Sequence, residues 1–306
     1  DARELLNGNF YYRADMTKIP KGIDIRNSDS DITDSNNHYS DLDRPEIDAG
    51  SVLQKIPGQI LGLNENKENP MAPISIANPD PAGVLTSRTF LMAHTVAGTN
   101  RRAVEFTFRE FMCSPIENWA DTKVPDTRIG RDIDRFPGGD HQKFLSNCKG
   151  CHTGMDGFRG AFAQWDVGNN RVGYGPLDNG GNFDNVDGNR IARKMNQNNN
   201  VFSDGFVTKT NGWINNARGP ANNSLFGWRS TEVSGNGLRS FGNLLSNSKR
   251  FSQCMVKRVF EGVCRRNLSI ENNLAFVDRL ANGFEGSNYN LKKLFQTVVV
   301  EKNCIE

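Results

Sequence analysis

The sequence predicts a mainly α-helical fold, and two observations carry that prediction. Apolar residues recur at three-to-four-residue spacing along four C-terminal segments, which is typical of amphipathic helices. These segments cover residues 237–248, 251–266, 271–284 and 290–302. Only short connections separate them, which favours antiparallel neighbours in a helical bundle. Upstream, helical patterns alternate with polar stretches rich in Asn and Gly, which predict long irregular loops. We therefore expect a loop-rich segment over 1–82, a helical domain over 83–225 and a helical domain over 226–306.

The N-terminal segment has little regular patterning. Asp, Asn and Ser dominate residues 27–43, and their carboxylates could bind calcium. The stretch lacks the glycine and the terminal glutamate of an EF-hand loop, so we interpret it as a solvated loop. Four prolines then predict an extended connector. They are Pro70, Pro73, Pro79 and Pro81.

The sequence pattern of the middle region predicts helices joined by loops. An apolar run over 84–94 is followed by an amphipathic helix that includes residues 103–112 and ends before Pro115. A polar loop over 117–140 leads to a short helix over 141–148, and a further helix is expected over 155–165. The remaining stretch, 167–225, is rich in Asn and Gly. Its pairs Asn179-Gly180 and Asp187-Gly188 indicate short hairpins or an irregular loop.

One pentapeptide, Cys148-Lys149-Gly150-Cys151-His152, has the C-x-x-C-H spacing of a c-type haem attachment site. One helical turn carries both thiols along the porphyrin edge, where each adds across a vinyl group. His152 then supplies the proximal nitrogen to the iron. The alternatives are a zinc site, for which further ligands at short spacing are missing, and a redox dithiol, for which no βαβ pattern is visible. We therefore expect one haem c bound by Cys148, Cys151 and His152.

The distal iron ligand does not follow from the motif. Small c-type cytochromes usually take a methionine well downstream, and Met195 in the loop-rich region is our first choice, with His94 as the alternative. Met155 follows His152 too closely to reach the other face of the iron. Four further possibilities are His141, Met92, Met255 and an open site.

Around the haem edge we expect Arg159 and Trp165 to contribute to cofactor binding. Arg159 has a charge suited to a haem propionate, as do Arg171 and Lys194, although each could instead be a solvated surface charge. Trp165 belongs to an aromatic stripe with Phe158 and Phe162, which faces either the haem or the protein core.

Composition and charge exclude several classes. Across 306 residues, Lys plus Arg total 37 and Asp plus Glu total 35, so the chain lacks the basic excess of a nucleic-acid-binding protein. No apolar run approaches the roughly 18–20 residues of a transmembrane helix. Neither G-x-S-x-G nor H-E-x-x-H occurs, so no hydrolase signature competes with the haem motif. The chain begins at Asp1 without a visible signal peptide, so we expect a processed, exported product.

The four cysteines outside the motif predict two disulfides in an oxidising compartment. Cys254 and Cys264 fall on one predicted helix, where a rise of 1.5 Å per residue separates them by about 15 Å. A disulfide tolerates Cα separations up to about 7 Å, so these two should not bond each other. Two pairings remain, Cys113–Cys254 with Cys264–Cys304 or Cys113–Cys264 with Cys254–Cys304, and we favour the first.

The string from Cys148 to Asp166 (CKGCHTGMDGFRGAFAQWD) is the most specific of several motifs that resemble the cytochrome-bearing and companion helical modules of large secreted proteins of Planctomycetes and marine bacteria. Looser matches are Gly83-Val84-Leu85-Thr86, Phe90-Leu91, Arg101-Arg102-Ala103, Phe111-Met112-Cys113-Ser114-Pro115, Phe251-x-x-Cys254, Arg258 and the run from Asn288 to Phe295. Together they span 83–305. The resemblance implies a periplasmic or surface-exposed monohaem cytochrome.

The sequence therefore favours a cytochrome-c-like haem domain followed by a helical bundle, acting in one-electron transfer with redox partner proteins. Two other hypotheses remain. One is a haem enzyme of peroxidase or oxidase type with an open distal position. The other is a structural subunit of a homo-oligomer or larger surface assembly, in which haem staples the fold.

Overall fold

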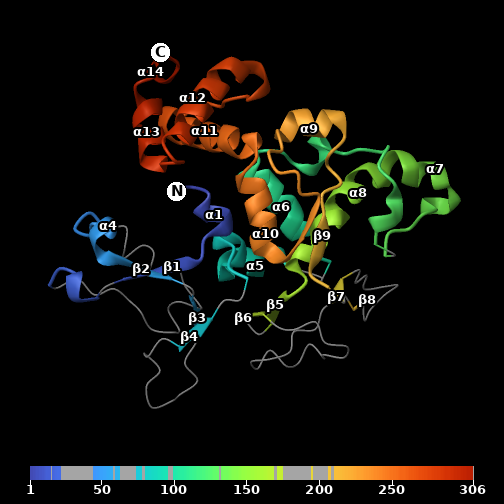
Figure 1. Ribbon diagram of the computed structural model, residues 1–306, viewed down its shortest axis with the longest axis horizontal. Coiled ribbons are helices and arrows are strands. Elements are labelled where there is room, and N and C mark those ends of the chain that lie inside the picture. Colours follow the sequence, from blue (N-terminus) through green and yellow to red (C-terminus); the bar gives the residue numbers. More distant parts are fainter. Residues whose placement is uncertain are drawn as a thin grey trace. The chain divides into compact units, whose positions relative to one another are not determined.

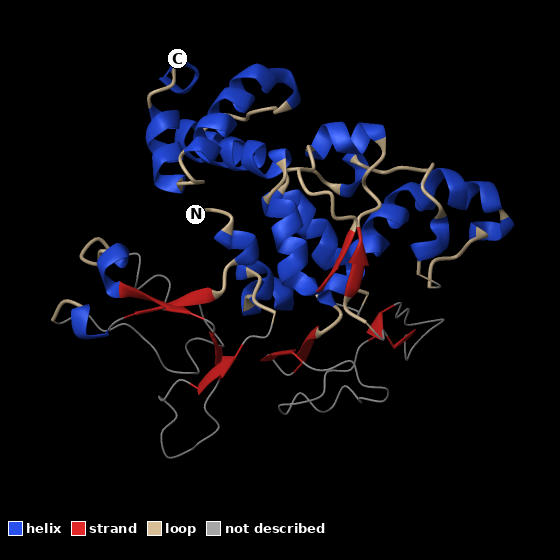
Figure 2. Ribbon diagram, in the orientation of Figure 1, coloured by secondary structure: helices blue, strands red, loops and turns tan. Residues whose placement is uncertain are grey.

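A computed structural model of the chain shows a mainly helical protein (Figures 1 and 2). It describes residues 1–14, 16–21, 44–57, 59–62, 74–77, 80–95, 99–130, 132–168, 171–174, 194–195, 206–207 and 210–305. The chain forms two compact units, one of residues 8–83 and one of residues 1–7 with 84–306. The expected boundary between 225 and 226 falls inside the larger unit. No helix in the described ranges is both long enough and apolar enough to cross a bilayer.

The smaller unit contains short paired strands. Strand β1 (Phe10–Ala14) pairs antiparallel with β2 (Leu53–Pro57), and β3 (Gln59–Gly62) pairs with β4 (Ile74–Ala77). A short helix, α4 (Ala49–Val52), precedes β2. Residues 27–43, considered above for calcium binding, lie outside the described residues.

In the larger unit, α7 (His141–Lys143) leads through a wide turn over Phe144–Cys148 to α8 (Lys149–Phe158), so Cys148 ends the turn and the other four motif residues lie on α8. The expected short helix before the motif is therefore present. The prediction of a separate helix over 155–165 is wrong, because one helix covers the motif and ends at Phe158. A 3-10 turn (Arg159–Phe162) follows, and Trp165 begins strand β5.

Short strands follow α8 in the loop-rich region. β5 (Trp165–Gly168) pairs antiparallel with β6 (Arg171–Tyr174), and β7 (Lys194–Met195) pairs with β8 (Phe206–Val207). β9 (Gly212–Ile214) pairs with β10 (Ser234–Asn236). The expected turns at Asn179-Gly180 and Asp187-Gly188 lie outside the described residues.

Most of the remaining helices of this unit agree with the predicted patterns, but the short helices over 4–7 and 302–305 were not predicted. Upstream of the motif are α1 (Glu4–Asn7), α5 (Arg88–His94) and α6 (Arg101–Phe111). Downstream are α9 (Pro220–Phe226), which was not expected, α10 (Gly237–Ser246), α11 (Lys249–Cys264), α12 (Leu274–Gly286), α13 (Leu291–Val299) and α14 (Lys302–Ile305). Side-chain caps start three of them: Ser87 accepts from the Phe90 amide, Ser248 from the Phe251 amide and Asn290 from the Lys293 amide.

Buried aromatic side chains join these helices into one core. The ring of Phe108 on α6 lies 4.4 Å from Trp119, 5.3 Å from Phe158 on α8, 5.5 Å from Phe226 on α9 and 6.1 Å from Phe241 on α10, measured between centroids. All five side chains are almost inaccessible to solvent. Helices from both sides of residue 225 therefore share a single hydrophobic core around the motif helix.

Glycines allow α8 and its following turn to approach their neighbours closely. A Cβ on Gly154 would lie 2.5 Å from the Trp119 ring, and a Cβ on Gly160 would lie 1.8 Å from the Gly212 carbonyl oxygen on β9. Both distances are shorter than any side-chain contact allows. These glycines lower helix propensity, so their presence here reflects packing rather than local preference.

Replacing Gly160 with alanine should therefore destabilise the fold strongly. The added methyl group would meet backbone, which cannot rotate away, so we expect a loss of roughly 3 kcal/mol or more in the free energy of unfolding. The matched control is Gly262→Ala on α11, where nothing lies within 4 Å of the added Cβ. That change should stabilise the helix by about 0.5–1 kcal/mol. Urea unfolding of both variants checks the prediction, and equal stability of Gly160→Ala and wild type would contradict it.

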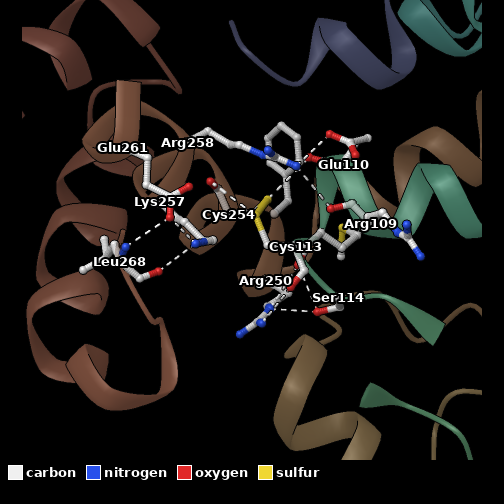
Figure 3. The surroundings of a disulfide bond; sticks show 12 residues. Arg109, Glu110, Cys113, Ser114, Arg250, Cys254, Lys257, Arg258, Glu261 and Leu268 are labelled. Atoms are coloured by element: carbon white, nitrogen blue, oxygen red, sulfur yellow. Dashed lines mark hydrogen bonds and ion pairs between the residues drawn. A yellow bond between two sulfur atoms is a disulfide. The ribbon is translucent and has the colours of Figure 1, made fainter. Parts of the chain in front are cut away.

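Two disulfides tie the larger unit together. Cys113 bonds Cys254 with Cα atoms 5.3 Å apart, and Cys264 bonds Cys304 with Cα atoms 4.9 Å apart. The favoured pairing is confirmed, and Cys254 and Cys264 do lie on one helix, α11. Figure 3 shows the first disulfide, which links the end of α6 to α11.

Arg250 reinforces the same junction. Its Nε donates to the Met112 carbonyl oxygen at 3.0 Å and to Ser114 Oγ at 3.0 Å, and its Nη2 donates to the Cys113 carbonyl oxygen at 3.1 Å. The guanidinium is buried, and Glu271 supplies the opposing charge at 2.9 Å. The turn after α6 is thus held by both a covalent bond and a side chain of α11 (Figure 3).

Ion pairs between the C-terminal helices predict acid sensitivity. Burial alone would raise the pKa of Asp278, but Lys249 and Gln253, each donating at 2.7 Å, hold that pKa below its ordinary value. A lowered carboxyl pKa stabilises the folded state above the unfolded pKa of about 3.9, and this stabilisation is lost as the pH falls through the folded value.

We therefore expect the free energy of unfolding to fall as the pH is lowered from about 5 to about 3. Asp278→Asn should lose less than about 1 kcal/mol at pH 7, because the pair is partly exposed, and should show a shallower acid dependence. Urea titrations at several pH values measure both effects. An unchanged slope in the variant would exclude Asp278 as a contributor.

Candidate functional site

The motif residues share the accessible face of α8. Cys148, Cys151, His152 and Met155 are each half-buried, and their spacing of three to four residues places them on one side of the helix. The other side is buried: it includes Gly154 against Trp119 and Thr153, whose hydroxyl donates to the Asp121 carbonyl oxygen at 3.2 Å. The packing of α8 thus leaves the two thiols and the imidazole together at the surface.

Both motif cysteines are free thiols, whereas the other four cysteines form disulfides. Burial raises the pKa of Cys151, and the nearby carboxylates of Glu117 and Glu105 raise it further. Redox dithiols and zinc sites use thiolates, which form readily when the thiol pKa is lowered. The described residues contain no group of three or more His, Cys, Asp or Glu able to hold a metal ion.

His152 has a carboxylate partner that the sequence interpretation missed. Its Nδ1 lies 3.4 Å from Oδ1 of Asp156, one helical turn later. The His152 side chain is 20% exposed, whereas the Asp156 side chain is fully buried. The spacing of four residues on one helix was the local signal for this pair. With Nδ1 directed to Asp156, Nε2 is the imidazole nitrogen left for a metal.

Asp156 is the centre of a buried charge cluster. Arg101, at the start of α6, donates to it from Nε at 2.7 Å and from Nη2 at 2.8 Å. Arg159 donates at 3.1 Å and the Gly130 amide at 2.7 Å. Arg101 also pairs with Asp132, at 2.8 Å from Nη2. We call Arg101, Asp132, Asp156 and Arg159 the buried charge cluster.

The cluster keeps Asp156 ionised. Burial alone would raise its pKa, but the hydrogen bonds from Arg101 and His152 and the charges of Arg159 and Arg101 hold the pKa well below its usual range. Burial lowers the pKa of Arg101, but its bonds to Asp156 and Asp132 outweigh that effect and raise it. The imidazole of His152 therefore faces a permanent negative charge that four other donor atoms hold in place.

The structure places the two residues expected at the haem edge away from solvent. Arg159 is buried, donates to Asp156 and lies 3.9 Å from Asp132, which puts it in the cluster behind His152. Trp165 is buried at the start of β5, with its ring 5.0 Å from that of Tyr174. Its indole Nε1 has no hydrogen-bond partner within the described part of the chain. Side chains of Arg171 and Lys194 are not described.

Among the expected distal ligands, His94 is the best described. It lies on α5 with its ring 4.1 Å from Phe106 and 4.7 Å from Phe90. Burial, and then the charge of Arg102, lower its pKa, so the neutral imidazole that a metal requires is favoured. The Met195 backbone lies in β7, but its side chain is not described.

The structure also describes the other three side chains considered as distal ligands. His141 has its Nδ1 2.8 Å from the Arg135 carbonyl oxygen and stacks on Phe144. Met255 is buried in α11, and Met92 is half-buried in α5.

Comparisons of the chain with models of known families, with curated proteins and with solved structures found no match. The site is therefore interpreted from its own chemistry. Two free thiols, an imidazole with Nε2 available and a carboxylate behind that imidazole form a donor set that fits haem c. Cys148 and Cys151 would hold the porphyrin edge, and His152 would hold the iron.

Proposed function

We propose that this chain is an exported monohaem c-type cytochrome that carries out one-electron transfer. The observation that carries the proposal is the shared accessible face of α8, where two free thiols stand beside an imidazole whose other nitrogen is occupied by Asp156. Among the sites considered for this motif, a haem c site is the one that uses all three side chains, the two thiols as thioethers and the imidazole as an iron ligand.

The three motif side chains would hold different parts of the cofactor. The thiols of Cys148 and Cys151 form the covalent links, and His152 Nε2 binds the iron. When bound, the haem supplies a one-electron redox centre. The apolar wall behind the motif, built on Phe108, Trp119 and Phe158, keeps α8 in place. A rigid site of this kind limits the structural change that accompanies electron transfer.

The disulfides support the proposed compartment. Two disulfides in one chain fit an oxidising environment, as found in the periplasm or at the cell surface. We propose that the chain exchanges electrons there with redox partner proteins. Within this proposal the distal ligand is Met195, with His94 as the alternative.

Spectroscopy of the purified protein tests the proposal. After expression in a host that matures c-type cytochromes, we expect a low-spin ferric spectrum, a reversible one-electron titration and slow cyanide binding. Met195→Ala should convert the iron to a high-spin form if Met195 is the distal ligand, while Met255→Ala, in the buried face of α11, should not. His94→Ala tests the alternative ligand in the same way. A high-spin wild-type spectrum with rapid cyanide binding would instead indicate an open site, as in a haem enzyme.

A further inference from the structure

The buried charge cluster has a desolvation cost that a structure selected for stability alone would avoid. The side chains of Asp132, Asp156 and Arg159 are at most 3% exposed, and that of Arg101 is 12% exposed. Removing a charge from water costs several kcal/mol, and ion pairing often only offsets that cost. Apolar residues of similar volume would stabilise the same junction at least as well. The position of the cluster, directly behind His152, indicates what it does instead.

The cluster fixes one carboxylate oxygen opposite the imidazole. Asp156 Oδ2 accepts from Arg101, Arg159 and the Gly130 amide, while Oδ1 accepts from Arg101 and faces His152 Nδ1. With both oxygens bound to groups from three segments of the chain, the carboxylate cannot turn away. The imidazole therefore meets an acceptor of fixed position and full negative charge.

We propose that Asp156 is a positioning residue that controls the haem iron through His152, holding Nε2 toward the metal and lowering the reduction potential of the bound haem. A carboxylate that accepts the Nδ1–H bond of a ligating histidine fixes its tautomer and raises its basicity. A more basic imidazole donates more electron density and stabilises the ferric over the ferrous iron. This inference rests on the proposed function, because it requires His152 to bind haem iron.

The separation of 3.4 Å between Nδ1 and Oδ1 is long for a hydrogen bond, whose usual range is about 2.7–3.2 Å. Hydrogen bonds from Arg101, Arg159 and the Gly130 amide hold Asp156, whereas the His152 side chain is 20% exposed. Binding of Nε2 to a metal fixes the ring plane. We expect the contact to shorten into the usual range in the haem-loaded protein.

The test compares two changes within the cluster. Asp156→Asn keeps the shape of the side chain but removes the charge opposite His152. Asp132→Asn removes a charge from the same cluster without touching His152. In haem-loaded protein we expect Asp156→Asn to shift the midpoint potential to more positive values and to move the Nδ1 proton of His152 upfield in NMR spectra of the reduced form. The control should leave that proton unchanged and shift the potential less. Equal behaviour of the two variants would overturn the proposal.

A measurement on the wild type keeps the inference testable if Asp156→Asn does not fold. In reduced protein labelled with ¹⁵N-histidine, we expect a downfield Nδ1 proton on His152 that exchanges slowly with water. A rapidly exchanging or missing Nδ1 proton in haem-loaded protein would overturn the role of Asp156 and leave the proposed function standing. Wild-type protein without covalent haem would overturn both.

Discussion

Replacing Cys148 and Cys151 together with alanine should abolish covalent haem attachment. Both thiols lie on the accessible face of α8, and they are the two cysteines not engaged in disulfides. Without them no thioether can form, and only the reversible bonds from His152 and the distal ligand would hold the iron. We expect complete loss of haem staining on denaturing gels and a much lower yield of folded protein, since the haem would no longer cover this face.

The matched control removes the same number of cysteines elsewhere. Cys264→Ala with Cys304→Ala breaks the disulfide between α11 and α14 but leaves the motif intact, so haem staining should persist. His152→Ala should keep the covalent pigment and change its spectrum, because the thiols remain while the proximal ligand is lost. Retention of the haem α-band after denaturation in the Cys148/Cys151 variant would contradict the assignment.

Removing the disulfide between Cys113 and Cys254 should cause the largest loss of stability among the variants that keep the motif. The bond joins positions 141 residues apart. Closing so long a loop restricts the unfolded chain by about 4–5 kcal/mol in the chain-entropy view. That amount is a large part of the roughly 5–15 kcal/mol by which a typical domain is stable. We expect Cys113→Ala with Cys254→Ala to lower the urea midpoint accordingly.

The second disulfide provides the internal comparison. Cys264 and Cys304 are 40 residues apart, so their removal should cost less, about 3–4 kcal/mol. Arg250 still holds the carbonyl oxygens of Met112 and Cys113 in the first variant, which should preserve the native arrangement of the turn after α6. A greater loss from the shorter loop would show that native-state contacts, rather than loop length, decide the effect.

The C-terminal helices, and the absence of a bond between Cys254 and Cys264, could be predicted because both depend on local geometry. Apolar spacing identified α10 to α13, and the rise per residue of one helix excluded a bond between Cys254 and Cys264. The motif also gave the candidate site, since C-x-x-C-H is predicted to carry its chemistry within five residues. In each case the decisive information lay within one helix.

What could not be predicted depends on contacts between distant segments. A helix was expected over 155–165, but α8 begins at Lys149, and its glycines allow it to pack closely against Trp119 and β9. Of the contacts in the site, only the one between His152 and Asp156 could have been predicted from spacing along one helix. Arg101 and Asp132 reach Asp156 from other parts of the chain. The amphipathic patterns likewise predicted that α6 and α10 each bury one face. They did not predict that these two faces pack against each other.

The mass of the intact, denatured chain tests the central claim most directly. The protein should be produced with an export signal in a host that matures c-type cytochromes, then unfolded in acid and measured by mass spectrometry. We predict a single species heavier than the polypeptide by one haem, with the pigment remaining on the chain after extraction with acidified organic solvent. A mass equal to the polypeptide alone, or pigment that separates into the solvent, would contradict the account.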